Sequence, residues 1–282
     1  MNQSVDTSST GEAIQSELKP SHHVKNQAGG GGGGAQIKYH NGPVIEGTVN
    51  VYFVWYGNWS GNTAPAILTD LASSIGGSPY YKINTPYYDV ISNVKHFVSG
   101  AVHYAGSTTD NYSYGTTLDD NTVFAVVDDA VTSGRLPEDT NGIYFVMTSA
   151  DVQESSGFCT QYCGWHWYDI DSNGKELRYA FVGDASTQCP SGCMEQTTGP
   201  NGNAGADGMA SVFSHELEEA NTDPRGTAWY DARGQENADK CAWTFGTTYK
   251  TANGALANMK LGARDFLIQR NWKLSTQSCG LN

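Results

Sequence analysis

The sequence predicts an α/β or α+β domain in which a mixed sheet packs against helices and disulfides stabilise the connections. Three observations predict this class. Apolar runs rich in β-branched and aromatic residues have the length of buried strands. Segments with apolar residues at helical spacing lie among these runs. Six cysteines, an even number, all lie in the second half of the 282 residues.

The predicted strands are short and strongly apolar. Residues 49–56 read VNVYFVWY, residues 143–147 read IYFVM, and residues 178–182 read RYAFV. Residues 94–104 form a further candidate strand in a segment rich in Tyr, Ser, Thr and Gly. The sequence DSNG at 171–174 predicts a hairpin turn, because Asn-Gly accepts the backbone conformation that tight hairpins require.

Three segments are predicted to be helices. The first begins at Thr63, a candidate cap, with Pro65 in its first turn, and ends before a Gly-Gly pair. The second covers residues 119–134, where valines recur on one face. The third covers residues 207–220, with Asp207 as its candidate cap.

The chain divides by composition into a tail and one domain. Residues 1–35 are polar and end in six consecutive glycines, which predicts a flexible tail or propeptide remnant joined by a linker. Residues 36–282 form the predicted single domain. The start of the chain lacks an apolar signal segment, so we expect a secreted form to have lost its leader and Met1 to be an added start.

The charge of the chain limits its partners. The formal net charge is −13 and the isoelectric point is about 4.8. We expect no nucleic-acid partner, because phosphate binding needs clustered Lys and Arg. We also expect no membrane partner, since no apolar run reaches the roughly 18 residues that span a bilayer.

The six cysteines predict three disulfides and therefore an extracellular, secreted protein. Two pairs have C-x3-C spacing, at Cys159 and Cys163 and at Cys189 and Cys193. The alternative is a zinc knuckle in a reduced protein, but cysteine zinc sites favour two or four intervening residues. The spacing does not determine which cysteines pair.

A candidate metal site lies in the segment SHELEE. His215 and Glu219 are four residues apart, so on a helix they share one face. In H-E-x-x-H metallopeptidases the Glu after the first His acts as general base, a role that Glu216 would take here. Glu219 replaces the second His and is itself a competent zinc ligand. We therefore expect a metzincin- or gluzincin-like arrangement around this HExxE helix, with one zinc ion. The alternative is a helix whose acidic face is merely solvated.

A third protein ligand is expected from the segment ENADKC. We assign Glu236 as that ligand and Asp239 as the acceptor that holds the distal nitrogen of His215, although the reverse assignment is nearly as good. Asp223 and Asp231 are weaker candidates.

His166 is a further candidate catalytic residue. It follows Cys163 in the segment CGWHW, beside an expected disulfide. It is a candidate to bind substrate or stabilise an oxyanion, and packing among aromatic residues is the alternative.

Calcium is only weakly supported as a cofactor. Residues 169–174 read DIDSNG, like the first half of a calcium loop. The twelfth position is Ala180, where the loop requires a bidentate Glu, so the hairpin is the preferred interpretation.

Several motifs together resemble the plant phosphate-induced protein 1 family, also called Exordium-like, with this chain similar to its bacterial relatives. The matching segments follow the family order from residue 37 to 282: YHNGPV with VNVYFVWYG, IYFVMTSADV, FCTQYCGWH, YAFVGDASTQCP, DGMASVFSHELEEANTDP, AWYD and ENADKC. The resemblance implies an extracellular or wall-associated protein linked to growth control. Asp231 departs from the plant pattern.

The sequence therefore predicts a secreted zinc metallopeptidase that acts on a peptide or protein substrate. His215, Glu219 and Glu236 would bind the metal, and Glu216 would activate water. The alternative is a non-enzymatic extracellular module that binds cell-wall glycan or a receptor and holds a structural metal. Its seven Trp and 16 Tyr would then supply sugar-stacking surfaces.

Overall fold

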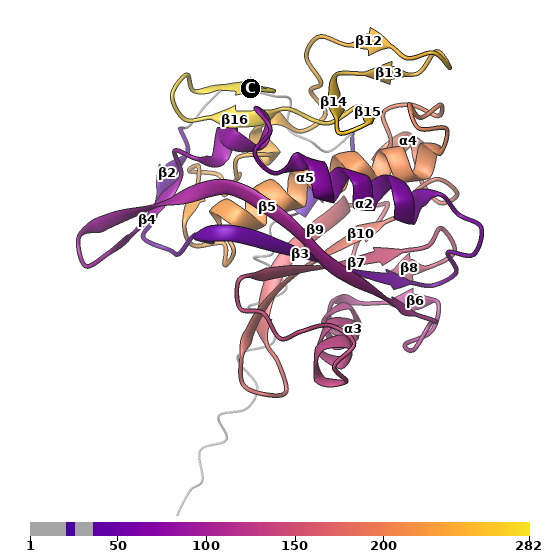
Figure 1. Ribbon diagram of the computed structural model, residues 1–282, viewed down its shortest axis with the longest axis horizontal. Coiled ribbons are helices and arrows are strands. Elements are labelled where there is room, and N and C mark those ends of the chain that lie inside the picture. The colour runs from indigo at the N-terminus through magenta and orange to yellow at the C-terminus, as the bar shows by residue number, and fades with distance from the viewer. Residues whose placement is uncertain (1–20, 26–35) are drawn as a thin grey trace, which may run out of the picture.

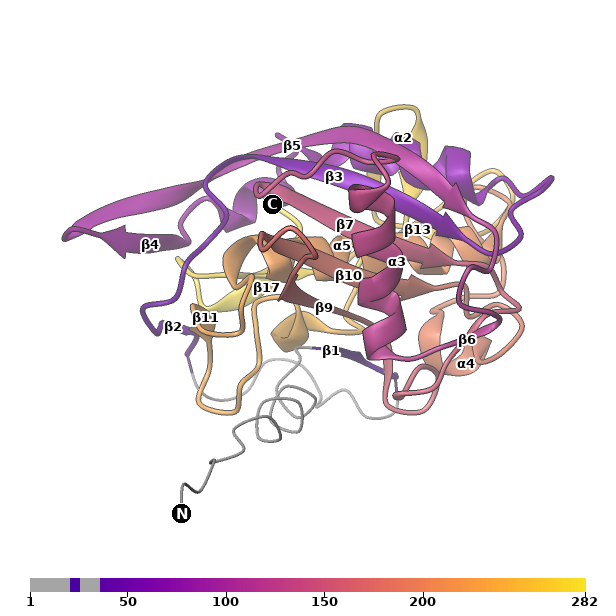
Figure 2. The ribbon, with the colours of Figure 1, turned by 90° about the horizontal axis from the view of Figure 1, so that it is seen from below.

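The computed structural model describes residues 21–25 and 36–282. Its central sheet consists of β1 (Ser21–His23), β3 (Gly47–Tyr56), β4 (Tyr88–Ile91), β5 (Val94–Asp110), β7 (Gly142–Thr148), β9 (Tyr162–Ile170) and β10 (Glu176–Gly183). The strand order is β1-β9-β10-β7-β3-β5-β4, and the sheet is strongly curled (Figures 1 and 2). Strands β10, β7, β3 and β5 are parallel, whereas β4, β9 and β1 pair antiparallel. The predicted mixed sheet is confirmed.

The three predicted apolar strands form the middle of this sheet. Residues 49–56, 143–147 and 178–182 lie in β3, β7 and β10, which are adjacent and parallel. Every residue of β7 is buried. Parallel strands covered on both faces read as continuous apolar runs, which explains why their sequences do not alternate. The predicted strand at 94–104 is longer in the structure, because β5 continues to Asp110.

Helices cover both faces of the sheet. Helices α2 (Ala64–Ile75) and α5 (Ala204–Thr222) lie on one face, and α3 (Asp120–Thr132) lies on the other (Figures 1 and 2). A fourth, short helix is α4 (Pro190–Cys193). Asp119 caps α3 through the backbone N–H of Thr122, within the predicted range. Thr63 does not cap α2 with its side chain, since Oδ1 of Asn62 accepts the N–H of Ala64 instead.

The start of α5 differs from the prediction. The helix begins three residues earlier, and Asn203 caps it by accepting the backbone N–H of Ala206. Asp207 is therefore not the cap, a prediction that was wrong. Its carboxylate instead accepts hydrogen bonds from the backbone and the amide of Asn201. The extended backbone of Asn203 provides the conformation that a cap requires.

Helix α5 is buried almost completely, including its polar residues. Its side facing the sheet contacts β9 and β10, and α2 packs beside it. Phe213 makes edge-on contacts with Phe53 and Phe145, which fix the helix on the sheet. The segment after residue 240 covers the outer side of α5 (Figure 1). The candidate metal motif therefore lies inside the molecule.

The predicted hairpin turn is confirmed between β9 and β10. These strands pair antiparallel, and Oδ1 of Asp171 accepts the backbone N–H groups of Asn173 and Lys175. Gly174 takes the left-handed conformation that the turn needs, with φ of 80°.

Short paired strands and two 3-10 turns complete the chain. The pairs are β2 (Lys38–Tyr39) with β11 (Trp229–Tyr230), β6 (Thr117–Leu118) with β8 (Gln153–Glu154), β12 (Tyr249–Lys250) with β13 (Leu256–Ala257), β14 (Met259–Leu261) with β15 (Arg264–Phe266), and β16 (Asn271–Lys273) with β17 (Ser278–Gly280). The turns are η1 (Tyr81–Asn84) and η2 (Asp239–Cys241).

Three disulfides connect these segments, as predicted, and no cysteine is free. They join Cys159 to Cys189, Cys163 to Cys193, and Cys241 to Cys279. The first two fasten the segment around α4 to the start of β9. Over residues 21–25 and 36–282, the helices are too short or too polar to cross a lipid bilayer.

The segment predicted to be a tail contributes one strand. Ser21–His23 forms β1, which pairs antiparallel with β9 at the edge of the sheet. The remaining residues of the predicted tail, 1–20 and 26–35, lie outside the described residues. The assignment of residues 36–282 as one domain stays a prediction.

Candidate metal centre

Six acidic and imidazole side chains converge from three parts of the fold. His166 comes from β9, and His215, Glu216 and Glu219 come from α5. Glu236 and Asp239 come from the segment that leads into η2, here called the ligand loop (residues 236–239). All but Asp239 are at most 1% exposed, and the Asp239 side chain is 10% exposed.

The His215–Glu219 pair forms one half of this cluster. Nε2 of His215 lies 2.9 Å from Oε1 of Glu219, as helical spacing predicts for residues four apart. Oδ1 of Asp239 lies 3.5 Å from the same nitrogen. The backbone N–H of Asp239 donates to Oε1 of Glu219 at 2.9 Å, which ties the ligand loop to the helix.

His166 forms the other half. Its Nε2 lies 3.2 Å from Oε2 of Glu236 and 3.9 Å from Oε2 of Glu219. Glu219 is therefore shared by both histidines. Among the described residues, no hydrogen bond reaches Oε2 of Glu219 or Oε1 of Glu236. Buried carboxylate oxygens without donors are rare in folded proteins and call for an explanation such as an ion.

The close packing of α5 on β9 places Glu216 in the cluster. A Cβ atom on Gly164 would come within 2.5 Å of Val212 and 3.1 Å of Oε1 of Glu216. Only glycine therefore allows the helix to approach β9 so closely. Because alternate residues of a strand share a face, His166 faces the helix as Gly164 does.

Burial shapes the protonation of this cluster. Burial, together with the charge of Asp239, raises the pKa of Glu219 from its ordinary 4.5 to about 7. Burial and the charge of Glu219 raise the pKa of Glu236 well above its usual value. Burial lowers the pKa of His166 to about 3, so this ring is neutral. Burial opposes charge on His215 as well, but neighbouring carboxylates outweigh it and raise its pKa well above normal.

This donor set fits a zinc ion. Two ligand atoms bound tetrahedrally at zinc, each ~2.1 Å from the ion, lie roughly 3.4 Å apart. The imidazole–carboxylate distances in the cluster run from 2.9 to 3.9 Å. Two sets of candidate ligands emerge, His166 with Glu216 and Glu219, and His215 with Glu219 and Asp239. Imidazole nitrogen and carboxylate oxygen are ordinary zinc ligands, and a divalent cation would replace the protons that these acids otherwise retain.

The structure brings together all six residues that the sequence singled out. Of the two alternatives for the third ligand, Asp239 approaches His215, whereas Glu236 approaches His166. Sequence reasoning did not propose His166 as a ligand. The signal was present as a histidine in an otherwise apolar strand sequence, but only the pairing of β9 with β10 and its packing on α5 reveal its neighbours.

The weaker ligand candidates serve other purposes. Asp223 accepts backbone N–H groups of Thr227, Ala228 and Trp229 after the end of α5. Asp231 forms a buried ion pair with Lys240 at 2.8 Å. Both acids thus hold the chain that leads into the ligand loop.

A second buried acid, Glu218, lies on a different side of α5. The amide of Asn271 donates to its carboxyl group and also to Asn84, and Asn84 accepts a hydrogen bond from Asn237. Burial raises the pKa of Glu218 well above its usual value. We call these four residues the amide cluster.

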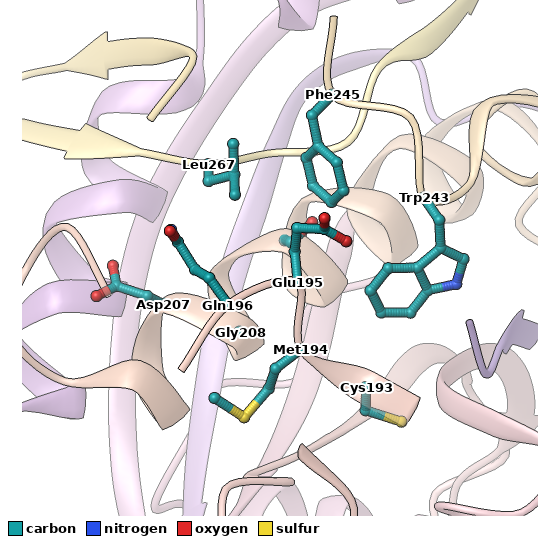
Figure 3. A pocket seen from close by; sticks show the side chains of 10 residues that line it. Cys193, Met194, Glu195, Gln196, Asp207, Gly208, Trp243, Phe245 and Leu267 are labelled. Carbon is teal, nitrogen blue, oxygen red and sulfur yellow. The ribbon is translucent and has the colours of Figure 1, made fainter. Parts of the chain in front are cut away.

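A pocket lies beside the first half of α5 (Figure 3). Trp243, Phe245 and Leu267 line it from the C-terminal segment, and Met194 and Gln196 face them. The helix contributes Asp207, Gly208 and Ser211, and Cys193 and Glu195 complete the lining. Ser211 is one helical turn before His215, so the pocket neighbours the metal cluster along the helix.

Comparison with known proteins places this chain among plant relatives. A profile described as the phosphate-induced protein 1 conserved region matches residues 37–281. The chain is 31% identical to Protein EXORDIUM-like 5 of Arabidopsis thaliana, over 86% of this chain and 77% of that protein. It is 30% identical to Protein EXORDIUM-like 3 of the same plant, over 86% of this chain and 82% of that protein.

A more distant relative is Protein PHOSPHATE-INDUCED 1 of Nicotiana tabacum, 24% identical over 87% of this chain and 82% of that protein. No solved structure matches the chain. None of these names states an enzymatic activity. Because the profile matches residues 37–281, the chain belongs to the phosphate-induced protein 1, or EXORDIUM-like, family.

Proposed function

We propose that this protein is a zinc-dependent peptidase. The observation that carries the proposal is the convergence of His166, His215, Glu216, Glu219 and Asp239 inside the fold, with candidate ligand atoms within 4.8 Å of one another in each set. An acidic cluster of this kind is costly to bury without a compensating cation. No solved structure matches the chain, so the expected metzincin- or gluzincin-like arrangement rests only on the HExxE helix and its packing on β9.

The proposed ligands are His215, Glu219 and Asp239, with His166 on the opposite side of Glu219. When bound, zinc supplies a Lewis acid that polarises a carbonyl and acidifies water. Glu236 lies 3.2 Å from Nε2 of His166 and orients that ring.

Glu216 is the proposed general base. It takes a proton from the attacking water, whose oxygen forms a bond to the peptide carbonyl carbon. The C–N bond then breaks, and Glu216 returns the proton to the leaving amine. Water is thereby divided between the two products, and no other reactant is required.

The decisive variant is Glu216→Gln. We expect it to retain zinc and lose hydrolysis by roughly 100-fold or more, because general acid–base catalysis contributes a factor of that size. Hydrolysis of a library of quenched fluorescent peptides would be measured beside zinc content. Glu218→Gln is the matched control, because Glu218 belongs to the amide cluster. Full activity of Glu216→Gln would remove this residue from the mechanism.

We propose an extracellular site of action. Three disulfides and the absence of free cysteines support an oxidising compartment.

One observation favours a second candidate function, an extracellular binding module with a structural metal. His166, His215 and the glutamates of the cluster are at most 1% exposed, as in a closed structural zinc site. The test is binding of soluble wall polysaccharides after zinc has been removed from folded protein. Retained glycan binding together with no peptide hydrolysis would favour this function over the peptidase.

A further inference from the structure

The outer edge of β9 carries a short strand from the N-terminal part of the chain. Figure 2 shows β1 beside β9. In β1, Ser21 lies opposite Trp165, His22 opposite Gly164, and His23 opposite Tyr162. Without β1, this edge would present unpaired backbone N–H and C=O groups, which readily accept another extended chain. The same strand carries His166, one residue beyond the paired segment.

The two residues after β1 lie between the segment that leads into β9 and the short helix α4, a position here called the groove. The backbone N–H of Val24 donates to the carbonyl of Gln161 at 3.0 Å, and that of Lys25 donates to the carbonyl of Gly192 at 2.8 Å. The Val24 side chain is 6% exposed and belongs to the main hydrophobic core. The disulfides at Cys159–Cys189 and Cys163–Cys193 fix both walls of this groove.

Charged and aromatic contacts complete the groove. Nζ of Lys25 lies 2.6 Å from Oε2 of Glu195 and 5.9 Å from the ring centre of Trp243. The indole N–H of Trp243 donates to the carbonyl of His23 at 2.9 Å. Glu195 and Trp243 also line the pocket of Figure 3, so the groove continues into that pocket.

The groove runs beside the metal cluster. Strand β1 contacts α5 and η2 as well as β9, the three elements that carry or border the candidate ligands. In the same antiparallel register, the residue of a bound peptide that precedes the position of Ser21 would lie opposite His166. That residue lies four positions before the one that takes the place of Val24.

We propose that the β9 edge is a binding groove for extended peptides, and that Ser21–Lys25 occupies it as an intramolecular stand-in. The groove takes peptides with an apolar residue followed by a basic one, matching the burial of Val24 and the Lys25–Glu195 pair. This inference rests on the proposed peptidase function for its biological meaning. It names the substrate class of that site, while the groove itself is testable by binding alone.

The experiment measures binding of a fluorescent synthetic peptide of residues 19–27 to the full chain by anisotropy. In the unmodified protein the tethered segment competes at high effective concentration. Val24→Asp places a charge in the apolar slot and should release the segment, raising affinity for the added peptide roughly tenfold or more. Val24→Ile is the matched control, which keeps the slot filled and should bind as weakly as the unmodified chain.

A charge exchange tests the basic preference without disturbing the core. Lys25→Glu in the chain should raise affinity for the added peptide by roughly two- to fivefold, the effect of one exposed ion pair. Adding Glu195→Lys to that variant should reverse the gain and shift preference to a peptide carrying Glu at position 25. This pair of variants keeps the test valid if Val24→Asp does not fold.

Two results would overturn the groove. One is a folded Val24→Asp protein, with unchanged thermal midpoint, that binds the peptide no better than the Val24→Ile control. The other is a peptide affinity that stays the same when Glu195→Lys is added to Lys25→Glu. Binding of this peptide, together with no hydrolysis of any peptide in the library, would keep the groove and reject the peptidase proposal. Hydrolysis of other peptides without binding of this one would reject the groove and keep the peptidase.

Discussion

Helix α5 buries acidic residues in two clusters, and the side chains that surround the acids differ between them. The carboxyl group of Glu218 accepts a hydrogen bond from the amide of Asn271, and the amides of Asn271 and Asn237 both donate to Asn84 beside it. Glu219, the next residue, lies beside two histidines and the carboxylate of Asp239. The two clusters share one helix and the same degree of burial, so their chemistry differs only through the neighbouring side chains.

This difference separates a structural acid from a candidate ligand. Neutral amides suit a carboxyl group that stays protonated, because no charge is then buried, although no hydrogen bond from the described residues reaches Oε1 of Glu218. Imidazoles and carboxylates that converge without enough donors suit a cation. Burial alone therefore does not identify a metal ligand, but the partners of each buried acid do.

The largest expected effect comes from removing one ligand. His215→Ala should weaken zinc binding by more than roughly 100-fold, since a ligand contributes at least as much as its supporting residues. Elemental mass spectrometry after dialysis should find about one equivalent of zinc in the unmodified protein and none in the variant. Glu218→Gln should keep the metal. Equal loss in both variants would mean that the two clusters do not differ as argued.

Zinc should stabilise the protein, and more strongly as the pH rises. At zinc concentrations ~100 times the dissociation constant, about 2.7 kcal/mol should raise the thermal midpoint by roughly 5–10 °C. The pKa of Glu219 is raised by burial from 4.5 to about 7, so the folded metal-free protein holds a proton that the unfolded chain has released. The contribution of Glu219 to the stability of the metal-free protein should therefore be fully present below pH 4.5 and be lost as the pH rises through about 7.

Calorimetry with and without zinc, on either side of neutral pH, checks this linkage. At the higher pH zinc no longer competes with the proton on Glu219, so the stabilisation by zinc should be larger there. An increment that is independent of pH, or larger in acid, would contradict proton displacement by the metal. The His215→Ala protein should show no increment at either pH.

The smallest effect is expected in the amide cluster. Glu218→Gln replaces a protonated carboxyl group with an amide of similar shape, so the free energy of unfolding should change by less than about 1 kcal/mol. Chemical denaturation with unchanged zinc content would measure it. A loss above about 2 kcal/mol would indicate that Glu218 carries a buried charge rather than a proton.

Local features of the fold could be predicted from sequence. Strands β3, β7 and β10 appear as continuous apolar runs because both of their faces are covered. The hairpin at Asn173-Gly174 followed from local backbone preferences. The even number of cysteines predicted three disulfides, but their pairing depends on which loops meet and is not encoded in spacing.

The non-local parts of the site could not be predicted. Helical spacing brings His215 to Glu219, but the approach of His166 depends on how α5 packs against Gly164. The choice between Glu236 and Asp239 depends on the path of a loop that local rules do not determine. The pairing of β1 with β9 was missed because a polar segment with two histidines carries no strand signal.

The bond between Cys241 and Cys279 ties the chain next to the ligand loop to the C-terminal segment. It starts two residues after the ligand loop and reaches a residue 38 positions downstream, and the backbone N–H of Trp272 donates to the carbonyl of Asn237 in the same region. We therefore expect the ligand loop to reach its final position once that downstream segment is in place and the thiols are oxidised. An ion at the proposed site would then be acquired late, and the metal available in the oxidising compartment would decide which ion the protein carries.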